Sequence, residues 1–259
     1  MRFRDVREYA EVDSTNRVAA DLVRSGAGEG LVVVADHQTA GRGRRGRSWE
    51  APPESSLLVS VVLRPPVDHA PGPSGVPGPS GPMSGVPAHL VTVACALAAG
   101  DACADVAGFA PDLKWPNDLV VGERKLGGVL AEVPVPGLAV VGLGLNVRWP
   151  GPMPAHLEAI VVTAESVAGG RLDTREILAA YLVRLETRCG DLADAAAVVA
   201  MMSDYRQRCV TLGRDVRIEL PGGRSWSGEA TDVHDDGSLE VSCDAGSRRV
   251  TAGDVVHLR

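Results

Sequence analysis

The segment Gly41-Arg42-Gly43-Arg44-Arg45-Gly46-Arg47 contains four arginines and three glycines in seven residues and is the starting point for predicting the fold. The apolar run 31–35 precedes it and the apolar run 57–63 follows it, and both are typical of buried strands. Glycine gives a loop the freedom to wrap a ligand, and arginine presents a planar charged group to carboxylates and phosphates. The segment therefore predicts a strand–loop–strand unit that closes over a small anion, although a basic surface loop or a nucleic-acid contact has the same composition.

The composition of the 259-residue chain fits one large globular domain with a smaller one. Hydrophobic residues make up 45% and aromatic residues 3%, so Val, Leu and Ala must fill most of the core. The net charge of −7 argues against a general nucleic-acid binder, whose affinity comes from neutralising phosphates. An arginine cluster in an acidic chain instead indicates a focused anion site.

Signals for metal sites, disulfides and export are weak. The five cysteines include no Cys-x-x-Cys pair and the six histidines show no His-x-x-x-His spacing, so we expect no metal site and no disulfide framework. No apolar segment follows residues 1–5, and no apolar run approaches the roughly 20 residues of a membrane span. We therefore expect a soluble cytoplasmic protein without a membrane partner.

Helix and strand patterns extend outward from the arginine-rich segment. Residues 7–12 alternate like a strand, and Asp13-Ser14-Thr15-Asn16 offers N-cap residues before a helix over 15–24. Capping is the simpler role for these polar residues, although a helix N-terminus can also bind a small ligand. Residues 70–87 repeat Gly and Pro, which predicts a flexible insertion, and the apolar residues 88–103 predict a buried helix.

The second half of the chain contains two more dense segments. Lys114 precedes the rigid turn at 116–118, where side chains commonly take part in chemistry, although a solvated lysine is the alternative. The strand 139–147 carries Gly142 and Gly144 in alternation, so one face allows a ligand or a neighbouring strand to come close. Helices are predicted to about 188 and over about 193–208, and period-two runs over 212–259 predict a small antiparallel β-barrel.

Five segments in this order resemble those of biotin protein ligases. They are Asp13–Asn16, Gln38–Arg47, Lys114–Leu119, Arg124–Glu132 and Gly142–Asn146. The resemblance covers about 7–259 and implies an α+β fold, with a central mixed β-sheet, helices on one side and a small C-terminal antiparallel β-barrel. It implies a catalytic domain over 1–211 and the barrel over 212–259.

The resemblance also implies an activity with two steps. The biotin carboxylate attacks the α-phosphate of ATP to give biotinyl-5′-AMP, and a lysine of a biotin carboxyl carrier protein, an acyl-CoA carboxylase subunit, then takes the biotin. ATP and Mg²⁺ are the implied co-substrates. About a dozen residues precede Asp13, so the DNA-binding helix-turn-helix of some relatives, and DNA as a partner, are not expected. A lipoate or octanoate ligase of the same fold and a non-catalytic biotin sensor are the alternatives.

Roles for individual residues follow from the same resemblance. The implied catalytic residues are Lys114, Arg42 and Arg44. The implied biotin-binding residues are Ser14, Thr15, Asn16, Gln38, Gly41, Arg42, Gly43, Arg44, Lys114, Gly127 and Gly128. The implied nucleotide-binding residues are Arg44, Arg45, Arg47, Trp49, Asn117, Lys125 and Asn146. The chemistry itself requires cations, because a carboxylate that attacks a phosphate brings two anions together. Mg²⁺ would be held mainly by phosphates and waters, without a protein metal cluster.

Overall fold

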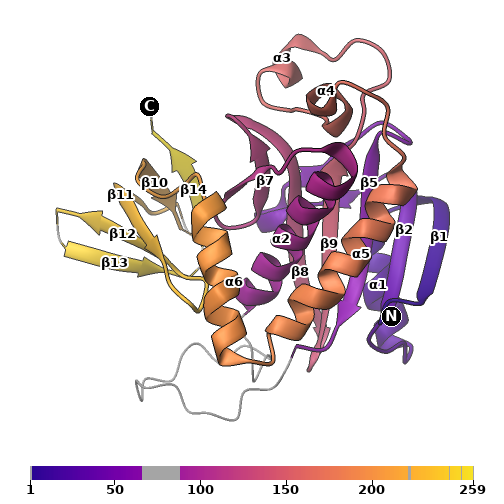
Figure 1. Cartoon of the computed structure of the whole chain (residues 1–259), viewed down its shortest axis with the longest axis horizontal. Helices are drawn as coiled ribbons and strands as arrows, with labels where there is room; N and C mark the ends of the chain where they lie inside the picture. The colour runs from indigo at the N-terminus through magenta and orange to yellow at the C-terminus, as the bar shows by residue number, and fades with distance from the viewer. Residues whose placement is uncertain (1, 66–87, 221–222, 245, 252, 259) are drawn as a thin grey trace.

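The described residues form a seven-stranded and a five-stranded β-sheet and a two-stranded hairpin, and helices pack around the largest sheet (Figure 1). The computed structural model describes residues 2–65, 88–220, 223–244, 246–251 and 253–258. The insertion predicted at 70–87 lies outside the described residues.

The larger sheet has seven strands in the order β1-β2-β5-β9-β8-β7-β6. Its outer strands are β1 (Asp5–Val12) and β2 (Leu31–Gln38) at one side, and β6 (Asp112–Lys114) and β7 (Asp118–Val121) at the other. Its central strands are β5 (Ser56–Leu63), β9 (Leu138–Asn146) and β8 (Arg124–Val135). Only β1 and β2 pair in parallel among its described ladders, so the predicted mixed sheet is confirmed.

The arginine-rich segment folds into a short hairpin between β2 and β5, and we call residues 41–49 the arginine hairpin. Strand β3 (Gly41–Arg42) pairs with β4 (Ser48–Trp49), and a 3-10 turn at Arg44–Gly46 joins them. Gly46 supplies the positive φ of 76° that this tight turn requires. Because β2 and β5 pair with each other, the predicted strand–loop–strand unit is confirmed.

Helices cover both faces of the sheet. The long helices α2 (Ala88–Ala107) and α5 (Thr174–Asp191) pack on one face, while α1 (Thr15–Arg24) packs on the other. Successive strand residues point to opposite faces, and the central strands are apolar on both, so each face must be covered. The prediction of helices on one side is therefore wrong for α1. The remaining helices are α3 (Ala155–Glu158), α4 (Ala164–Ala168) and α6 (Ala195–Arg208).

Helix α2 forms the centre of the larger core. Its stretch His89–Ala107 is 19 residues long with a mean hydropathy of 1.6, so it is long and apolar enough to cross a membrane. The sequence-based statement that no apolar run approaches this length is therefore wrong. In the fold, 67% of that stretch is buried between the sheet and α5, which identifies it as a core helix.

The C-terminal strands form a separate antiparallel sheet at one end of the molecule (Figure 1). The order is β13 (Gly246–Val250), β12 (Leu239–Cys243), β11 (Ser225–Val233), β10 (Asp215–Glu219) and β14 (Asp254–His257). No ladder joins β13 to β14 within the described residues, so closure into a barrel stays a prediction. The loop between β11 and β12 contacts the segment that follows β6, since Trp115 Nε1 donates a hydrogen bond to Gly237 O at 3.0 Å.

Candidate active site

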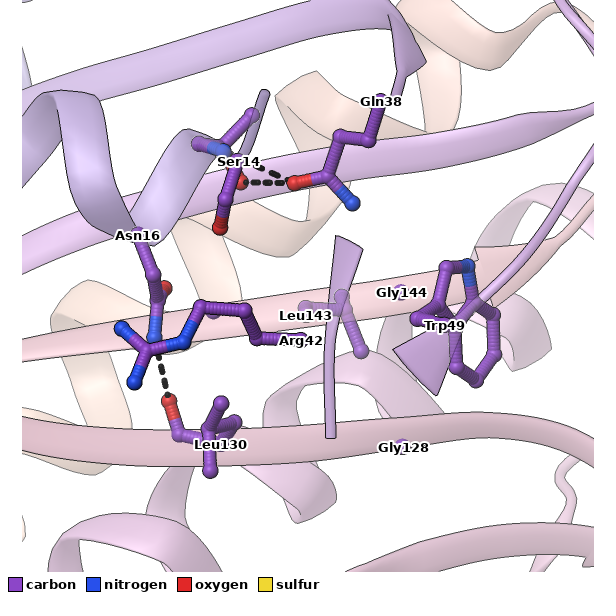
Figure 2. Close-up of a pocket in the computed structure, with 11 residues that line it drawn as sticks. Ser14, Asn16, Gln38, Arg42, Trp49, Gly128, Leu130, Leu143 and Gly144 are labelled. Carbon is purple, nitrogen blue, oxygen red and sulfur yellow. Dashed lines mark hydrogen bonds between the residues drawn. The ribbon is translucent and has the colours of Figure 1, made fainter. Parts of the chain in front are cut away.

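A cavity of about 40 Å³ lies on the face of the large sheet that carries α1 (Figure 2). The start of α1, the end of β2, the arginine hairpin and the strands β8 and β9 enclose it. Its walls are Ser14, Thr15, Asn16, Gln38, Arg42, Trp49, Gly128, Leu130, Gly142, Leu143 and Gly144. The structure therefore brings together residues from four of the five segments that resemble biotin protein ligases.

Two further cavities continue from the first along β8. One of about 90 Å³ shares Arg42, Trp49, Gly128 and Leu130 with it and adds Arg44, Arg47, Asn117 and Lys125, among others. The next, of about 240 Å³, begins at Arg44 and Asn117 and reaches Arg45, His89 and Pro116. Most of the predicted biotin and nucleotide residues thus line three cavities that share lining residues, and the exceptions are Gly41, Lys114, Gly127 and Asn146.

The polar residues at the start of α1 face the first cavity. Ser14 takes the N-cap position, but its side chain makes no capping hydrogen bond. Thr15 donates to Gln38 Oε1 through its backbone N–H at 2.7 Å and its hydroxyl at 3.0 Å. Ser60 Oγ lies 2.7 Å from Asn16 Oδ1 and donates to it. The interpretation of these residues as side-chain caps is therefore wrong, and they form a buried polar wall.

Glu132 and Ser60 also contact this wall, although neither was predicted as a site residue. Asn16 Nδ2 donates to Glu132 Oε2 at 2.9 Å, and Arg42 Nη1 lies 3.0 Å from Glu132 Oε1. A period-two signal could have found Glu132, because it follows Gly128 and Leu130 on the cavity side of β8. For Ser60 the available signal was its position as the single polar residue within the apolar run 57–63.

Two glycines of β9 make room for this site. A Cβ on Gly142 would overlap Asn16 Oδ1, and a Cβ on Gly144 would lie 2.7 Å from Cε2 of Trp49. The predicted close approach at this strand is made by the side chains of Asn16 and Trp49, and the approach of a ligand stays a prediction. Gly127, in contrast, faces the neighbouring strand, since its Cβ would lie 2.8 Å from Gly144 O, and it lines none of the three cavities.

Trp49 separates the first cavity from the second. Its Nε1 is buried and meets no acceptor in the part of the chain that the structure describes. Lys125 Nζ lies 5.6 Å from the centroid of its ring, within the range of a cation–π contact, and 2.7 Å from Asp118 Oδ1. Figure 2 shows Trp49 at one end of the cavity near Gly144, with Arg42 extended toward Asn16.

The other arginines of the hairpin contact the C-terminal sheet. Arg44, Arg45 and Arg47 lie 3.8, 3.2 and 3.0 Å from the carboxylate of Asp254. Arg44 also donates to Asn117 Oδ1 at 3.3 Å, and burial lowers the pKa of its guanidinium, which nevertheless stays charged. Their nucleotide-binding role stays a prediction, since phosphates would have to compete with Asp254.

Lys114 and Asn146 lie outside the three cavities. Lys114 is half-buried at the end of β6, and its side chain forms no hydrogen bond or ion pair with the described residues. Nearby, burial and then the charge of Lys114 lower the pKa of His257 to about 4, so this ring is neutral at pH 7. His257 Nε2 lies 3.2 Å from the hydroxyl of Thr211, and Asn146 Nδ2 donates to the backbone oxygen of Lys125 at 3.3 Å.

Comparison with known proteins assigns the chain to a family. Residues 9–146 match the Biotin/lipoate A/B protein ligase family, and residues 211–258 match the Biotin protein ligase C terminal domain. The chain belongs to the biotin protein ligase family. Among biotin protein ligases, the Biotin--[acetyl-CoA-carboxylase] ligase of Mycobacterium tuberculosis is 35% identical over 99% of this chain and 90% of its own length. The ligase of the same name from Paracoccus denitrificans is 29% identical over 95% of this chain and 98% of its own length.

Solved structures of biotin protein ligases share the fold. The Aquifex aeolicus ligase in complex with biotin and ATP superimposes with a TM-score of 0.81 over 99% of this chain and 100% of that chain, at 23% identity. The Leishmania major ligase in complex with biotinyl-5-AMP has a TM-score of 0.60 over 98% of each chain, also at 23% identity. At this identity the likeness establishes the biotin protein ligase fold of the chain.

Proposed function

We propose that this biotin protein ligase attaches biotin to a lysine of an acceptor protein, with ATP consumed and biotinyl-5′-AMP as the intermediate. The continuous run of cavities along β8 carries the proposal. Its first part has a buried polar wall around Asn16, and its second part presents the cations Arg44 and Lys125. This arrangement suits a molecule with a polar ring at one end and an anionic group at the other.

The chemistry of the first step explains the cations. A biotin carboxylate oxygen forms a bond to the α-phosphorus of ATP while the bond to pyrophosphate breaks, so two anions meet in the transition state. Arg42, Arg44 and Lys114 offset this repulsion in our proposal. The support is that the Lys114 side chain forms no ion pair with the described residues. The nearby carboxylate of Glu123 pairs with Arg214, which lowers the pKa of Glu123 together with a smaller effect of the Lys114 charge.

The second step transfers the biotin acyl group. The neutral amine of the acceptor lysine attacks the carbonyl carbon of the mixed anhydride, AMP leaves, and the amine proton is released. The mixed anhydride must be shielded from water until then. The position of the arginine hairpin supports this role, because Arg42 and Trp49 line a cavity of about 40 Å³, which is far smaller than the about 300 Å³ of typical ligand pockets. In our proposal the hairpin opens to admit the ligand and closes over it.

Mg²⁺ is proposed to arrive with ATP. Within the described residues, no three His, Cys, Asp or Glu side chains gather to hold a metal ion. Mg²⁺ commonly binds through substrate phosphates and waters with few protein ligands, so this site fits an ion carried by the nucleotide. When bound, it would neutralise phosphate charge.

Other parts of the assignment are also proposals. We place the catalytic domain at 1–211 and the C-terminal domain at 212–259, which the matches at 9–146 and 211–258 support. The name of the Mycobacterium tuberculosis relative supports a carboxylase as the acceptor, and a carrier protein of that enzyme is our candidate. We propose no role for DNA and place the reaction in the cytoplasm, where ATP is available.

The exchange of labelled pyrophosphate into ATP tests the first step, with biotin, lipoate and octanoate supplied in parallel. We expect exchange that requires biotin. Exchange with lipoate or octanoate instead would assign the chain to the sister ligases that share its fold. Binding of biotin without any exchange would indicate a sensor.

A further inference from the structure

Glu132 holds two of the residues that face the ligand cavity. Its Oε2 accepts a hydrogen bond from Asn16 Nδ2 at 2.9 Å, and its Oε1 lies 3.0 Å from Arg42 Nη1. Asn16 lies in the first turn of α1, Arg42 belongs to the arginine hairpin, and Glu132 lies on β8. One carboxylate therefore links three elements around the cavity.

The bond to Asn16 is partly buried and contributes to how its amide is oriented. Asn16 is 3% exposed, and its two amide ends meet different partners, with Ser60 donating to Oδ1 and with Glu132 and Leu130 O accepting from Nδ2. A carboxylate accepts hydrogen bonds and cannot donate them when ionised, so Glu132 excludes the flipped amide. The presentation of Asn16 to a ligand thus depends on Glu132.

The contact with Arg42 is of another kind. The Arg42 side chain is 52% exposed and that of Glu132 is 28% exposed. Solvent-exposed ion pairs are weak, and therefore this contact can break and reform as the hairpin moves. Glu132 thus combines a lasting hydrogen bond to Asn16 in the cavity wall with an ion pair to Arg42 of the arginine hairpin that can break.

We propose that Glu132 is a positioning residue of the acid-binding site, which fixes the Asn16 amide and restrains the arginine hairpin through Arg42. The proposal rests on the proposed function, because it takes biotin as the acid that the cavity binds. It adds a residue whose carboxylate acts through Asn16 and Arg42 and not through the reacting atoms.

Two variants separate the roles. Glu132→Gln keeps an oxygen that accepts from Asn16 but loses the charge that attracts Arg42, whereas Glu132→Ala loses both. Asp105→Ala is the matched control, because Asp105 pairs with Arg184 on the exposed surface of α2 and α5, away from the cavity. Calorimetric titration of the full chain with biotin gives the dissociation constant of each variant.

The expected result is a graded loss of biotin affinity. Freeing the Asn16 amide should raise the dissociation constant about tenfold in Glu132→Ala, whereas Glu132→Gln should stay within about threefold of wild type. In pyrophosphate exchange the loss should lie in the KM for biotin, with kcat changed less than about twofold. In the Asn16→Ala background, Glu132→Ala should cause no further loss, because the amide it positions is absent.

Tryptic cleavage within residues 42–47 of the ligand-free protein tests the restraint on Arg42. Both Glu132 variants should be cut about two- to fivefold faster than wild type, the acceleration that loss of an exposed ion pair allows. Asp105→Ala should be cut at the wild-type rate. This readout needs no ligand and therefore does not depend on the identity of the acid.

The outcomes distinguish the two proposals. Wild-type biotin affinity in Glu132→Ala, or losses from Asn16→Ala and Glu132→Ala that multiply, would overturn the positioning role and leave the ligase assignment intact. Unchanged cleavage in both Glu132 variants would overturn the restraint on Arg42. Absence of biotin binding by the wild-type chain would overturn the proposed function and, with it, the role of Glu132 toward biotin.

Discussion

Replacement of Gly142 by alanine should disable acid binding through the displacement of Asn16. The new Cβ would overlap Asn16 Oδ1 and lie 3.1 Å from its Cγ, in a place that is closed by Ser60 and Glu132. The strand cannot retreat, because Gly142 pairs with Ser60 on β5 and with Leu130 on β8. Asn16 must therefore leave its position.

The magnitude follows from the contacts that are lost. Displaced Asn16 gives up its hydrogen bonds with Ser60, Glu132 and Leu130, and burial of unsatisfied polar groups costs about 1–3 kcal/mol. Overpacking a core position costs about 1–3 kcal/mol as well. Moving Asn16 to relieve the steric clash breaks its hydrogen bonds, so the two costs cannot both be avoided. We expect the free energy of unfolding to fall by about 2–4 kcal/mol and biotin affinity to fall at least about 100-fold, equivalent to about 2.7 kcal/mol.

Urea unfolding and calorimetric titration with biotin measure the two effects. Gly190→Ala is the matched control, because a Cβ added at this position on α5 would meet no atom of a neighbouring element within 4 Å. This variant should keep the wild-type stability and biotin affinity. Combining Gly142→Ala with Asn16→Ala should restore much of the stability without restoring biotin affinity, since the clash disappears together with the ligand contact. Wild-type biotin affinity in Gly142→Ala would refute the role given to Asn16.

Three other perturbations follow from the site. Lys114→Ala should lower the rate of pyrophosphate exchange at least about 100-fold while circular dichroism and melting stay as in wild type, and a wild-type rate would contradict its assignment. Asp254→Ala should lower the free energy of unfolding by about 1–3 kcal/mol and accelerate tryptic cleavage in the arginine hairpin, because three arginines lose a carboxylate that is 19% exposed; an unchanged urea midpoint would contradict this. For His257, a folded-state pKa of about 4 means that its stabilising effect is complete above about pH 6.5 and is lost as the pH falls toward 4. The difference is worth at most about 3 kcal/mol at 1.36 kcal/mol per pKa unit, and about half of that after solvent screening, so urea unfolding at pH 7.5 and 4.5 should show a larger loss in wild type than in His257→Gln.

The parts of the fold that were predicted correctly have local signals. The apolar runs 31–35 and 57–63 appear as β2 and β5, and the polar residues 13–16 mark the start of α1. The alternating glycines of β9 indicated a close approach, which is possible only because these positions carry no side chain. In each case neighbouring residues carry the physical cause, so a single sequence is enough to read it.

The parts that were missed depend on tertiary packing. The amphipathic pattern of α1 shows that one side is buried but not which face of the sheet it covers. Asp254 pairs with Arg45 across 209 positions of the chain, and nothing near either residue indicates the other. Ser60 is a single polar residue in an apolar strand, and its partner Asn16 becomes evident only when β5 lies beneath α1.

The arginine hairpin shows why a sequence can predict an anion site and still miss the protein carboxylates that contact its arginines. Arg42 contacts Glu132 on the large sheet, whereas Arg44, Arg45 and Arg47 surround Asp254 on the C-terminal sheet. These carboxylates offset the charges of the four arginines. In our proposal, an anionic ligand competes with them and gains affinity only by the difference between the two sets of contacts. The carboxylates that hold the hairpin, and that such a ligand would have to displace, therefore lie outside the arginine-rich segment itself.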